Sequence, residues 1–540
     1  MAQIRKLPIG IQSFEVLRTG GCLYVDKTAL IHQLASTEIP YFLSRPRRFG
    51  KSLLVSAFKA YFEGRKELFE GLAIEQLEEK WEKYPVLHLD LNAKDYNNVE
   101  ALHAILNRHL DEWEKRYVGK EQTDAPEDRF FNVIKRACEQ TGKRVVVLVD
   151  EYDKPLLANL LNDKLSDQLR RALKAFYGVL KSAGDYLRFV FITGVTKFAQ
   201  VTVFSDLNQL SDISMEEQYT TLCGITKEEL LQVFQPEIAA LAKKQKLSFD
   251  AAVAEMTQRY DGYHFAPDTP GMFNPFSVLN ALGYGNLKDY WFQTGTPTFL
   301  ADLLTNSDYD LRLLVDGTQM AASDFAEYRA QKDNPIPLIY QSGYLTIQGY
   351  DREFRLYTLG FPNDEVRYGF MNFLAPYYTQ VRRGETPAYI AGFAKALRAG
   401  DVDSFLHHMK VFFAGMSYEL SDDTERHYQA IFYVILTLMC EFVQTEVRSA
   451  HGRADAVVKT DKYIYLFEFK LNDTAEAALQ QIDEREYLLP YTLDGRQLIK
   501  VGVSFDKEKR NIGRYLIEPR NKTSVSLGTK PLSASEQNFC

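Results

Sequence analysis

The apolar segments of the first 215 residues constrain the fold of this chain most strongly. Those at residues 39–44, 86–91, 144–150 and 187–193 are short, strand-like and end in polar or acidic residues. Long segments with helical periodicity lie between them. Strands that alternate with helices predict a parallel sheet covered by helices on both faces. We therefore expect an α/β domain over residues 1–222.

Beyond this domain the pattern changes. The chain turns helical at Thr226, which with Glu229 fits a capping box before an apolar run. Residues 261–378 are richer in Gly, Pro and aromatic residues and mix short helices with hairpin-like strands, such as one at residues 343–347. We expect a helical lid and a mixed middle region over residues 223–384, with a winged helix near residues 334–347 as one interpretation.

Residues 385–518 return to clear helix and strand patterns and predict a second α/β domain. The remaining residues, 519–540, are rich in Ser, Thr, Asn and Lys and predict a disordered tail. Within the second domain we expect helices at 391–398, 402–414, 425–440 and 474–487, and strands at 445–447, 453–460, 463–470 and 498–504.

Composition limits the classes of function. The 540 residues carry a formal net charge of −8, so the chain is not a polycation that coats nucleic acid, and any such contact must be local. The five cysteines are far apart and form no CxxC pair, which favours a reducing compartment without disulfides or zinc. The longest apolar run, residues 430–440, is shorter than the roughly 20 residues that span a bilayer. We expect a cytoplasmic protein with no membrane partner, because the N-terminus also lacks an apolar signal segment.

A phosphate-loop pattern follows the first strand. Gly50, Lys51 and Ser52 match the end of G-x-x-x-x-G-K-[ST], although Arg45 stands in place of the first glycine. Lys51 would reach the β- and γ-phosphates, and Ser52 would bind Mg²⁺. The tripeptide alone also suits a cationic surface turn, but its position between an apolar strand and an apolar helix favours a nucleotide site. The residues predicted to bind ATP in this loop are Arg45, Arg47, Arg48, Phe49, Gly50, Lys51, Ser52 and Leu53.

Acidic residues follow a second apolar strand, at 144–150. Asp150 would hold Mg²⁺ through water, and Glu151 would polarise the attacking water. Acids at a strand end are also common helix caps, which is the alternative interpretation. Thr193, at the end of the strand at 187–193, would sense the γ-phosphate. Together with the phosphate loop, this arrangement predicts a P-loop NTPase.

These stretches resemble a known family, the AAA-ATPase-like proteins common in bacteria. The motifs that carry the resemblance cover most of residues 1–520, and they are YVDKT (24–28), RPRRFGKSLL (45–54), DEYDKP (150–155), FITGVTKF (191–198), YDGY (260–263), NPFS (274–277), TGTP (294–297) and FPN (361–363). In that family the first loop position is commonly arginine, which suits Arg45. The resemblance implies an AAA-type ATPase joined to a C-terminal nuclease-like domain.

A carboxylate–lysine pattern in the C-terminal region leads to the same expectation. If residues 453–470 form a hairpin, Thr460 lies opposite Tyr463 and Asp455 lies opposite Glu468. Glu468 and Lys470 share one face of their strand, because side chains alternate, and the opposite face is apolar, with Tyr463, Tyr465, Phe467 and Phe469. Facing carboxylates bind a hard cation such as Mg²⁺ or Mn²⁺, and Lys470 would position or deprotonate a water.

This spacing, D-x₁₂-E-x-K, resembles the PD-(D/E)XK nuclease superfamily and its restriction-endonuclease-like α/β fold. Ala454 stands where the motif's name has proline. Gln481, in the following helix, matches a glutamine of that nuclease group. Glu425 and Glu446 are candidate additional acids. A solvated strand face is the alternative interpretation of an E-x-K pattern alone.

The combined prediction is an ATP-binding and ATP-hydrolysing protein whose nucleotide state controls a metal-dependent nuclease acting on DNA or RNA, with homo-oligomers as a further expectation. One alternative is a nucleotide-switched signalling or scaffold protein with an inactive nuclease fold. Another is a nuclease whose nucleotide site binds ATP without turnover.

Overall fold

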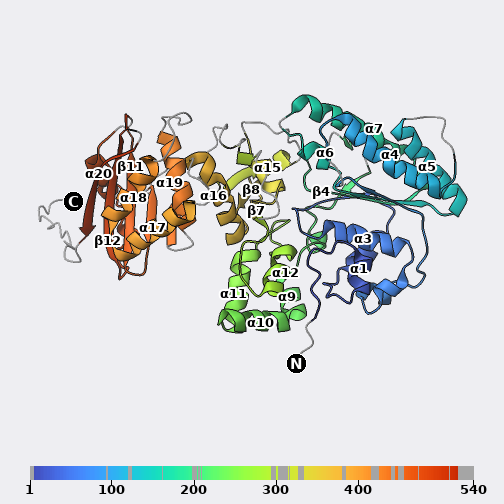
Figure 1. Cartoon of the computed structure of the whole chain (residues 1–540), viewed down its shortest axis with the longest axis horizontal. Helices are drawn as coiled ribbons and strands as arrows, with labels where there is room; N and C mark the ends of the chain where they lie inside the picture. Colours follow the sequence, from blue (N-terminus) through green and yellow to red (C-terminus); the bar gives the residue numbers. More distant parts are fainter. Residues whose placement is uncertain are drawn as a thin grey trace, which may run out of the picture. The chain divides into compact units, whose positions relative to one another are not determined.

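The structure is a computed structural model and forms two compact units, residues 1–377 and 378–540 (Figure 1). It describes residues 5–92, 95–119, 125–160, 162–197, 203–204, 207, 209–292, 300–301, 304, 314, 317–325, 334–379, 385–414, 425–439, 444–447, 455–471, 473–506, 508–509 and 511–520. Over these ranges, no helix combines the length and apolar character needed to cross a bilayer. The domain boundaries expected near residues 222, 384 and 518 stay predictions.

The first unit contains the predicted parallel sheet. Its strand order is β2-β3-β4-β1-β5, and every pair of neighbouring strands is parallel. The strands are β1 (Tyr41–Ser44), β2 (Val86–Asp90), β3 (Val145–Asp150), β4 (Leu187–Gly194) and β5 (Ser211–Asp212). All residues of β3 are buried, as expected for a central strand covered on both faces. The first four strands confirm the four apolar segments.

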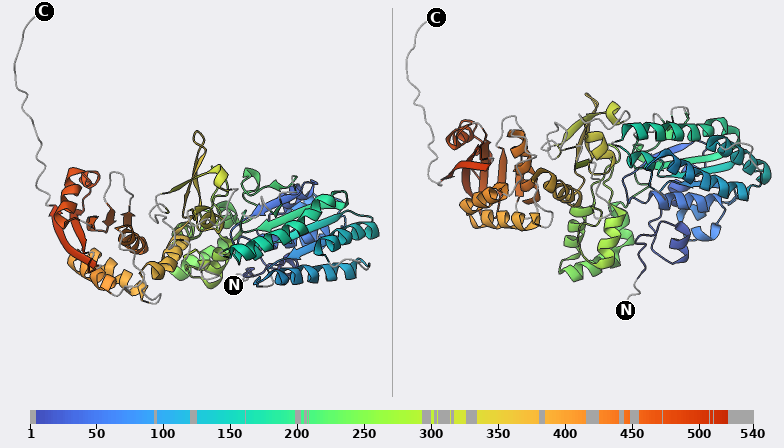
Figure 2. Two further views of the ribbon diagram at one scale, coloured as in Figure 1. Left: turned by 90° about the horizontal axis from the view of Figure 1, so that it is seen from above. Right: turned by 45° about the horizontal axis from the view of Figure 1, so that its top comes forward.

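Helices cover both faces of this sheet (Figures 1 and 2). One layer contains α1 (Phe14–Thr19), α2 (Thr28–Ala35) and α3 (Lys51–Phe62), and the other contains α4 (Val99–Arg116), α5 (Pro126–Thr141) and α7 (Asp163–Ser182). On α7, Leu169, Leu173, Phe176 and Leu180 recur at helical spacing and are buried in the core over the sheet. Short helices complete this part: η1 (Lys66–Phe69), η2 (Ala73–Gln76), α6 (Lys154–Leu157) and η3 (Gly184–Tyr186).

A helical group follows, as predicted. It consists of η4 (Glu217–Tyr219), α9 (Lys227–Val233), α10 (Gln235–Gln245), α11 (Phe249–Tyr260) and α12 (Pro275–Tyr284). The Thr226–Glu229 capping box is present at the start of α9. At the start of α12, Asn274 accepts hydrogen bonds from the first turn, and Pro275 occupies the first position, where no donor is lost.

A three-stranded antiparallel sheet was not predicted. Its order is β6-β8-β7, from β6 (Thr318–Ala321), β7 (Thr346–Asp351) and β8 (Leu356–Gly360). The strand expected at residues 343–347 begins at Thr346 instead. The neighbouring helices are η6 (Ala322–Phe325), α15 (Ile336–Gln341) and α16 (Asp364–Thr379). The winged-helix interpretation stays a prediction.

The second unit is built on a five-stranded mixed sheet of order β13-β12-β11-β10-β9. The strands are β9 (Gln444–Val447), β10 (Ala456–Lys459), β11 (Tyr463–Lys470), β12 (Gln497–Asp506) and β13 (Asn511–Arg520), and the helices are α17 (Thr386–Ala399), α18 (Val402–Ala414), α19 (Glu425–Met439), α20 (Ala475–Glu484) and η7 (Leu489–Tyr491). The strand β13 was not predicted. Residues 519 and 520 belong to it rather than to a disordered tail, and residues 521–540 lie outside the described residues.

The two faces of β11 meet different helices. Tyr465, Phe467 and Phe469 are buried against α17, α18 and α19, through contacts that include the Phe405–Phe467 and Phe432–Phe469 ring pairs. The opposite face packs on α20. This arrangement confirms the predicted apolar face and leaves Glu468 and Lys470 on the α20 side.

Candidate functional sites

The loop between β1 and α3 curls around the Lys51 side chain. Arg48 (φ +67°) and Gly50 (φ +92°) adopt left-handed backbone conformations, which turn the chain directly into the helix. Lys51 is 4% exposed, and its ammonium group donates to the carbonyl oxygens of Arg45 (2.9 Å) and Pro46 (3.1 Å). The free N–H groups of the first turn of α3 therefore open beside a buried cation, which favours an anion.

A pocket of about 400 Å³ lies over this helix start. Arg47, Arg48, Lys51 and Ser52 line it, together with Glu151. The backbone of Glu151 is left-handed (φ +52°). This conformation is uncommon for residues other than glycine, and such residues cluster at functional sites. The structure thus brings the predicted phosphate-binding cations, the predicted metal-binding hydroxyl and the predicted general base to one pocket. Gly50 and Leu53 also line it.

Asp150 and Thr193 lie side by side at the ends of β3 and β4. The Thr193 hydroxyl donates to Asp150 Oδ1 at 2.7 Å. Thr193 is 0% exposed and Asp150 is 4% exposed. Because this hydroxyl gives its single proton to Asp150, it has none to offer to a phosphate oxygen in this arrangement. Thr193 therefore positions the acid, and its predicted contact with a γ-phosphate stays a prediction.

The side chains of Arg45 and Phe49 do not line this pocket. The Arg45 guanidinium is buried, donates to the Ser214 carbonyl oxygen at 2.7 Å, and lies 4.0 Å from the centre of the Phe265 ring. Burial lowers the pKa of Arg45 to about 10. Phe49 packs edge-on against Tyr263 and Phe265. Carbonyl and aromatic partners hold the Arg45 side chain outside this pocket, and its predicted contact with the nucleotide stays a prediction.

Other residues of this pocket were missed by the sequence analysis. Asn92, which follows β2, and Lys154, which follows the acidic strand end, both line it. Pro275 and Phe276 at the start of α12 form a wall, and the Arg48 guanidinium lies 5.2 Å from the centre of the Phe276 ring. The carboxyl ends of neighbouring parallel strands meet at one edge, which could have indicated Asn92. The NPFS motif could have indicated α12.

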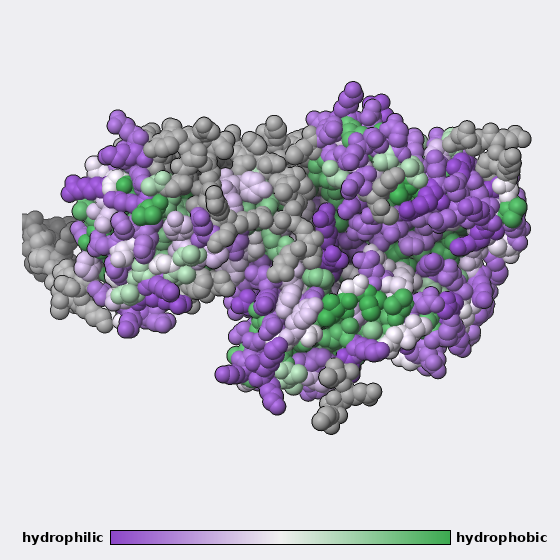
Figure 3. Space-filling view, viewed as in Figure 1, coloured by the Kyte–Doolittle hydropathy of each residue, from purple (hydrophilic) through white to green (hydrophobic). Residues whose placement is uncertain are grey.

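A smaller, mainly apolar pocket of about 100 Å³ adjoins the first one. The two pockets share Gly50, Leu53, Pro275 and Leu279. Figure 3 shows apolar side chains gathered on the face of the first unit around α1 and α12. A charged pocket next to an apolar one matches a ligand that has an anionic end and an aromatic end.

In the second unit, β10 and β11 pair in the predicted register. Ala456 lies opposite Phe467, and the Thr460 N–H donates to the Tyr463 carbonyl oxygen at 2.8 Å. The same register sets Asp455 opposite Glu468, and the Asp455 N–H donates to Glu468 Oε2 at 3.3 Å. The predicted pairing of the two acids is thus confirmed.

Lys470 and Gln481 complete this cluster. The Lys470 ammonium group donates to Glu468 Oε1 at 3.2 Å and to Gln481 Oε1 at 2.5 Å, and the Gln481 amide donates to Glu468. Glu468 is 2% exposed. Burial, and then the charge of Asp455, raise the pKa of Glu468 to about 7, while Lys470 lowers it. All four predicted residues therefore meet on the α20 side of the sheet.

The donor set of this cluster fits a hard divalent cation. Two facing carboxylates supply oxygen ligands, which Mg²⁺ and Mn²⁺ prefer. Burial and the charge of Asp455 raise the pKa of Glu468, and a bound cation would oppose both effects by favouring the carboxylate form. No group of three or more acidic, His or Cys ligands occurs in the described part of the chain. The side chains of Glu425 and Glu446 lie outside the described part.

Comparison with known proteins agrees with the two expected domain types. Residues 8–204 match a family model described as predicted AAA-ATPase, and residues 423–515 match a model of the PD-(D/E)XK nuclease superfamily. The chain belongs to this AAA-ATPase-like family. A relative from Azotobacter chroococcum mcd 1, described as "Uncharacterized protein in vnfD 5'region", is 33% identical over 533 residues. The alignment covers 95% of this AAA-ATPase-like chain and 99% of that relative.

Proposed function

We propose that this AAA-ATPase-like protein binds and hydrolyses ATP in the pocket over α3, and that its second unit is a metal-dependent nuclease controlled by the nucleotide state. The observation that carries the ATPase proposal is that Lys51, Ser52 and Glu151 line one pocket. The smaller apolar pocket beside it supports a nucleotide rather than a bare polyphosphate, because it offers a place for the base.

The chemistry follows from the side chains of this pocket. Arg47, Arg48 and Lys51 neutralise phosphate charge, most strongly where it grows in the transition state. Ser52 in the pocket and Asp150, which directly precedes Glu151 at the end of β3, would hold Mg²⁺, and the cation would withdraw charge from the phosphate. Glu151 orients and polarises the attacking water.

In the second unit, Asp455 and Glu468 would hold Mg²⁺ or Mn²⁺, and the cation would polarise a phosphodiester and activate water. Lys470 lies next to Glu468 and would position or deprotonate the attacking water. Gln481 holds the Lys470 ammonium group in place. An acidic chain can act on DNA or RNA in this way, because the metal supplies positive charge where the polyanion binds.

Control of the nuclease by ATP is motivated by the presence of both sites on one chain. The alternative is a nucleotide-switched signalling or scaffold protein whose nuclease fold is inactive. The Lys470–Glu468–Gln481 contacts favour an active site over this alternative, because each candidate catalytic group has a partner that orients it. Cytoplasmic location and homo-oligomer formation stay predictions.

The test is incubation of the full chain with single- and double-stranded DNA and RNA, with and without ATP, in Mg²⁺ or Mn²⁺. Lys51→Ala should abolish ATP binding, and Glu151→Gln should bind ATP but lower phosphate release by about 10²-fold or more. Lys470→Met should abolish cleavage without changing ATP hydrolysis. Cleavage that is indifferent to ATP and to Lys51→Ala would refute nucleotide control. Absence of cleavage by the wild type on all substrates would favour the scaffold alternative.

A further inference from the structure

The backbone of Glu151 needs support from its surroundings. A left-handed conformation at a residue with a side chain is disfavoured and persists only where neighbouring contacts hold it. Two backbone contacts flank it: the Tyr152 N–H donates to the Thr193 carbonyl oxygen at 3.0 Å, and the Lys154 N–H donates to the Glu151 carbonyl oxygen at 3.1 Å. The end of β4 is therefore part of what fixes Glu151.

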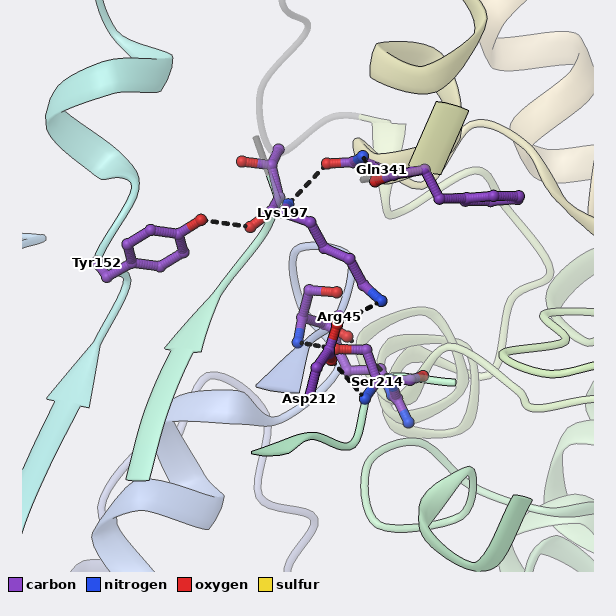
Figure 4. Close-up of polar contacts among 9 residues, drawn as sticks. Arg45, Tyr152, Lys197, Asp212, Ser214 and Gln341 are labelled. Atoms are coloured by element: carbon purple, nitrogen blue, oxygen red, sulfur yellow. Dashed lines mark hydrogen bonds and ion pairs between the residues drawn. The ribbon is translucent and has the colours of Figure 1, made fainter. Parts of the chain in front are cut away.

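Asp153 ties the same turn to the segment that follows β4, residues 195–197. Asp153 is 1% exposed, and its carboxylate accepts hydrogen bonds from the N–H groups of Val195 and Thr196, the latter at 2.6 Å. It also accepts a bond from the Thr196 hydroxyl at 2.6 Å. On the other side of Thr196, its carbonyl oxygen accepts the Tyr152 hydroxyl at 3.0 Å (Figure 4). Thr196 is thus held through its N–H, its hydroxyl and its carbonyl group.

The fit between the two strand ends leaves no spare room. A Cβ added at Gly194 would lie 2.5 Å from the Tyr152 ring and 2.9 Å from Asp153 Oδ1. Such distances are well inside van der Waals contact, and the obstructing ring is buried. Any side chain at this position would push the end of β4 away from Tyr152 and Asp153.

The segment at 195–197 also contacts the middle region. The Lys197 N–H donates to Gln341 Oε1 at 2.7 Å, and the Gln341 amide donates to the Phe325 carbonyl oxygen at 3.3 Å. The Lys197 ammonium group pairs with Asp212 at 2.8 Å. Figure 4 shows Tyr152 and Gln341 approaching this segment from opposite sides. One short segment therefore joins the catalytic edge of the parallel sheet to α15.

We propose that Asp153 is a positioning residue for ATP hydrolysis: by holding Thr196, it fixes the turn that directs Glu151 into the pocket, and through Lys197 and Gln341 it connects that turn to α15. The proposal rests on the ATPase function proposed above. Asp153 acts through Glu151, because it does not line the pocket and its oxygens are already occupied by donors. The same bonds make α15 the element of the middle region that is sensitive to a change at the catalytic edge.

The kinetic test uses matched variants of the full chain. Thr196→Val removes the hydroxyl at nearly constant volume, Thr196→Ser keeps it, and Gly194→Ala forces the strand ends apart without removing a polar group. We expect Thr196→Val and Gly194→Ala to lower kcat for ATP by about 30-fold or more with KM changed less than about 3-fold, since only the transition-state contact is lost. Thr196→Ser and Thr19→Val, which changes an exposed threonine of α1, should stay near wild type.

A double-mutant cycle separates positioning from general damage. In a Glu151→Gln background, Thr196→Val should cause little further loss of kcat, because its effect passes through Glu151. An equal loss in both backgrounds, or an unchanged kcat in Thr196→Val and Gly194→Ala, would overturn the proposal while leaving the ATPase function intact. A wild type without ATP hydrolysis would overturn the ATPase function, and the positioning role with it. Should Thr196→Val fail to fold, Gly194→Ala carries the same cycle.

The connection to α15 has its own readout. Amide hydrogen exchange over residues 336–347 should change on ATP binding in the wild type and lose that change in Gln341→Leu, which removes both bonds of the amide. Gln348→Leu, on the neighbouring strand, is the matched control. An ATP-dependent change of equal size in Gln341→Leu would overturn the connection.

Discussion

A buried carboxyl group, Glu365, makes the stability of the first unit depend on pH. Glu365 lies near the start of α16 and is 1% exposed. It accepts hydrogen bonds from the Ser277 hydroxyl and the Trp291 N–H, both at 2.7 Å. Burial raises the pKa of Glu365 to about 7, and these hydrogen bonds only partly offset it. The neutral acid is therefore the form that this site accommodates best.

The sign of the effect follows from proton linkage. The ordinary pKa of a glutamate is 4.5. Between pH 4.5 and about pH 7, the folded chain therefore keeps a proton on Glu365 that the unfolded chain releases. The stabilising contribution is thus complete below pH 4.5 and is lost as the pH rises through 7. At 1.36 kcal/mol per pH unit, this interval corresponds to about 3 kcal/mol in all, of which about 2.5 kcal/mol is lost between pH 5 and pH 8.

Glu365→Gln isolates this contribution. The amide is neutral at every pH and can reproduce the protonated acid, because its oxygen accepts from the Trp291 N–H and its NH₂ group donates to the Ser277 hydroxyl. The free energy of unfolding of the wild type minus that of Glu365→Gln should therefore fall by about 2.5 kcal/mol from pH 5 to pH 8. Other titrating groups cancel in this difference.

The assay is urea unfolding of the full chain followed by tryptophan emission. The chain has three tryptophans, Trp81, Trp113 and Trp291, and all of them lie in the first unit, so the signal reports that unit alone. Glu353→Gln, at an exposed position between β7 and β8, should give a difference that does not change with pH. A flat difference for Glu365→Gln, or one of opposite slope, would refute the assignment of a buried neutral acid.

Further variants test the placement of single side chains. Arg45→Met should lower the free energy of unfolding of the first unit by about 3 kcal/mol, because buried carbonyl groups lose their donor, whereas Arg48→Met should weaken ATP binding about 10-fold in a titration without changing the urea midpoint. Gln481→Leu should slow cleavage by about 10- to 100-fold, because the Lys470 ammonium group loses one of its two partners, and a cleavage rate equal to wild type would contradict this role. Tyr465→Phe should cost the second unit about 1 kcal/mol by removing the hydroxyl bond to α17, which thermal unfolding can measure.

The features that the sequence predicts well are those set by local periodicity. The hairpin at residues 455–468 pairs as expected, because Glu468 and Lys470 alternate with Phe467 and Phe469 on β11, and a slip of one residue would turn the charged side chains to the other face. The position of Asp150 and Glu151 at the end of a strand could also be predicted, because a fully apolar run is typical of a central strand and this run ends at the two acids. Both candidate sites could therefore be located from motif and spacing alone.

The direction of a long side chain could not be predicted from the sequence in the same way. Arg45 stands in a loop beside Lys51, and its charge predicts a phosphate ligand, yet its guanidinium is buried beneath Phe265, 220 positions later in the chain. Such a partner cannot be found from local sequence, because an arginine side chain can extend to either side of its loop. The choice depends on which distant segment supplies carbonyl oxygens and an aromatic ring.

The wall that α12 contributes to the nucleotide pocket depends partly on local sequence and partly on distant tertiary contacts. Asn274 and Pro275 predict a helix start from the sequence. The Asn274 side chain can cap the first turn, and Pro275 stands at the first helical position, where a backbone N–H is not needed. Two tertiary contacts place this helix start opposite Lys51 and Ser52. The hydroxyl of Ser277, in the same helix, donates a hydrogen bond to Glu365. The indole N–H of Trp291 donates to the carbonyl oxygen of Arg47 in the phosphate loop. Because these partners come from separate segments of the chain, the pocket is complete only when the helical group and α16 are folded onto the parallel sheet. The loop motif therefore predicts the chemistry of the site, while its shape depends on tertiary contacts that the motif does not contain.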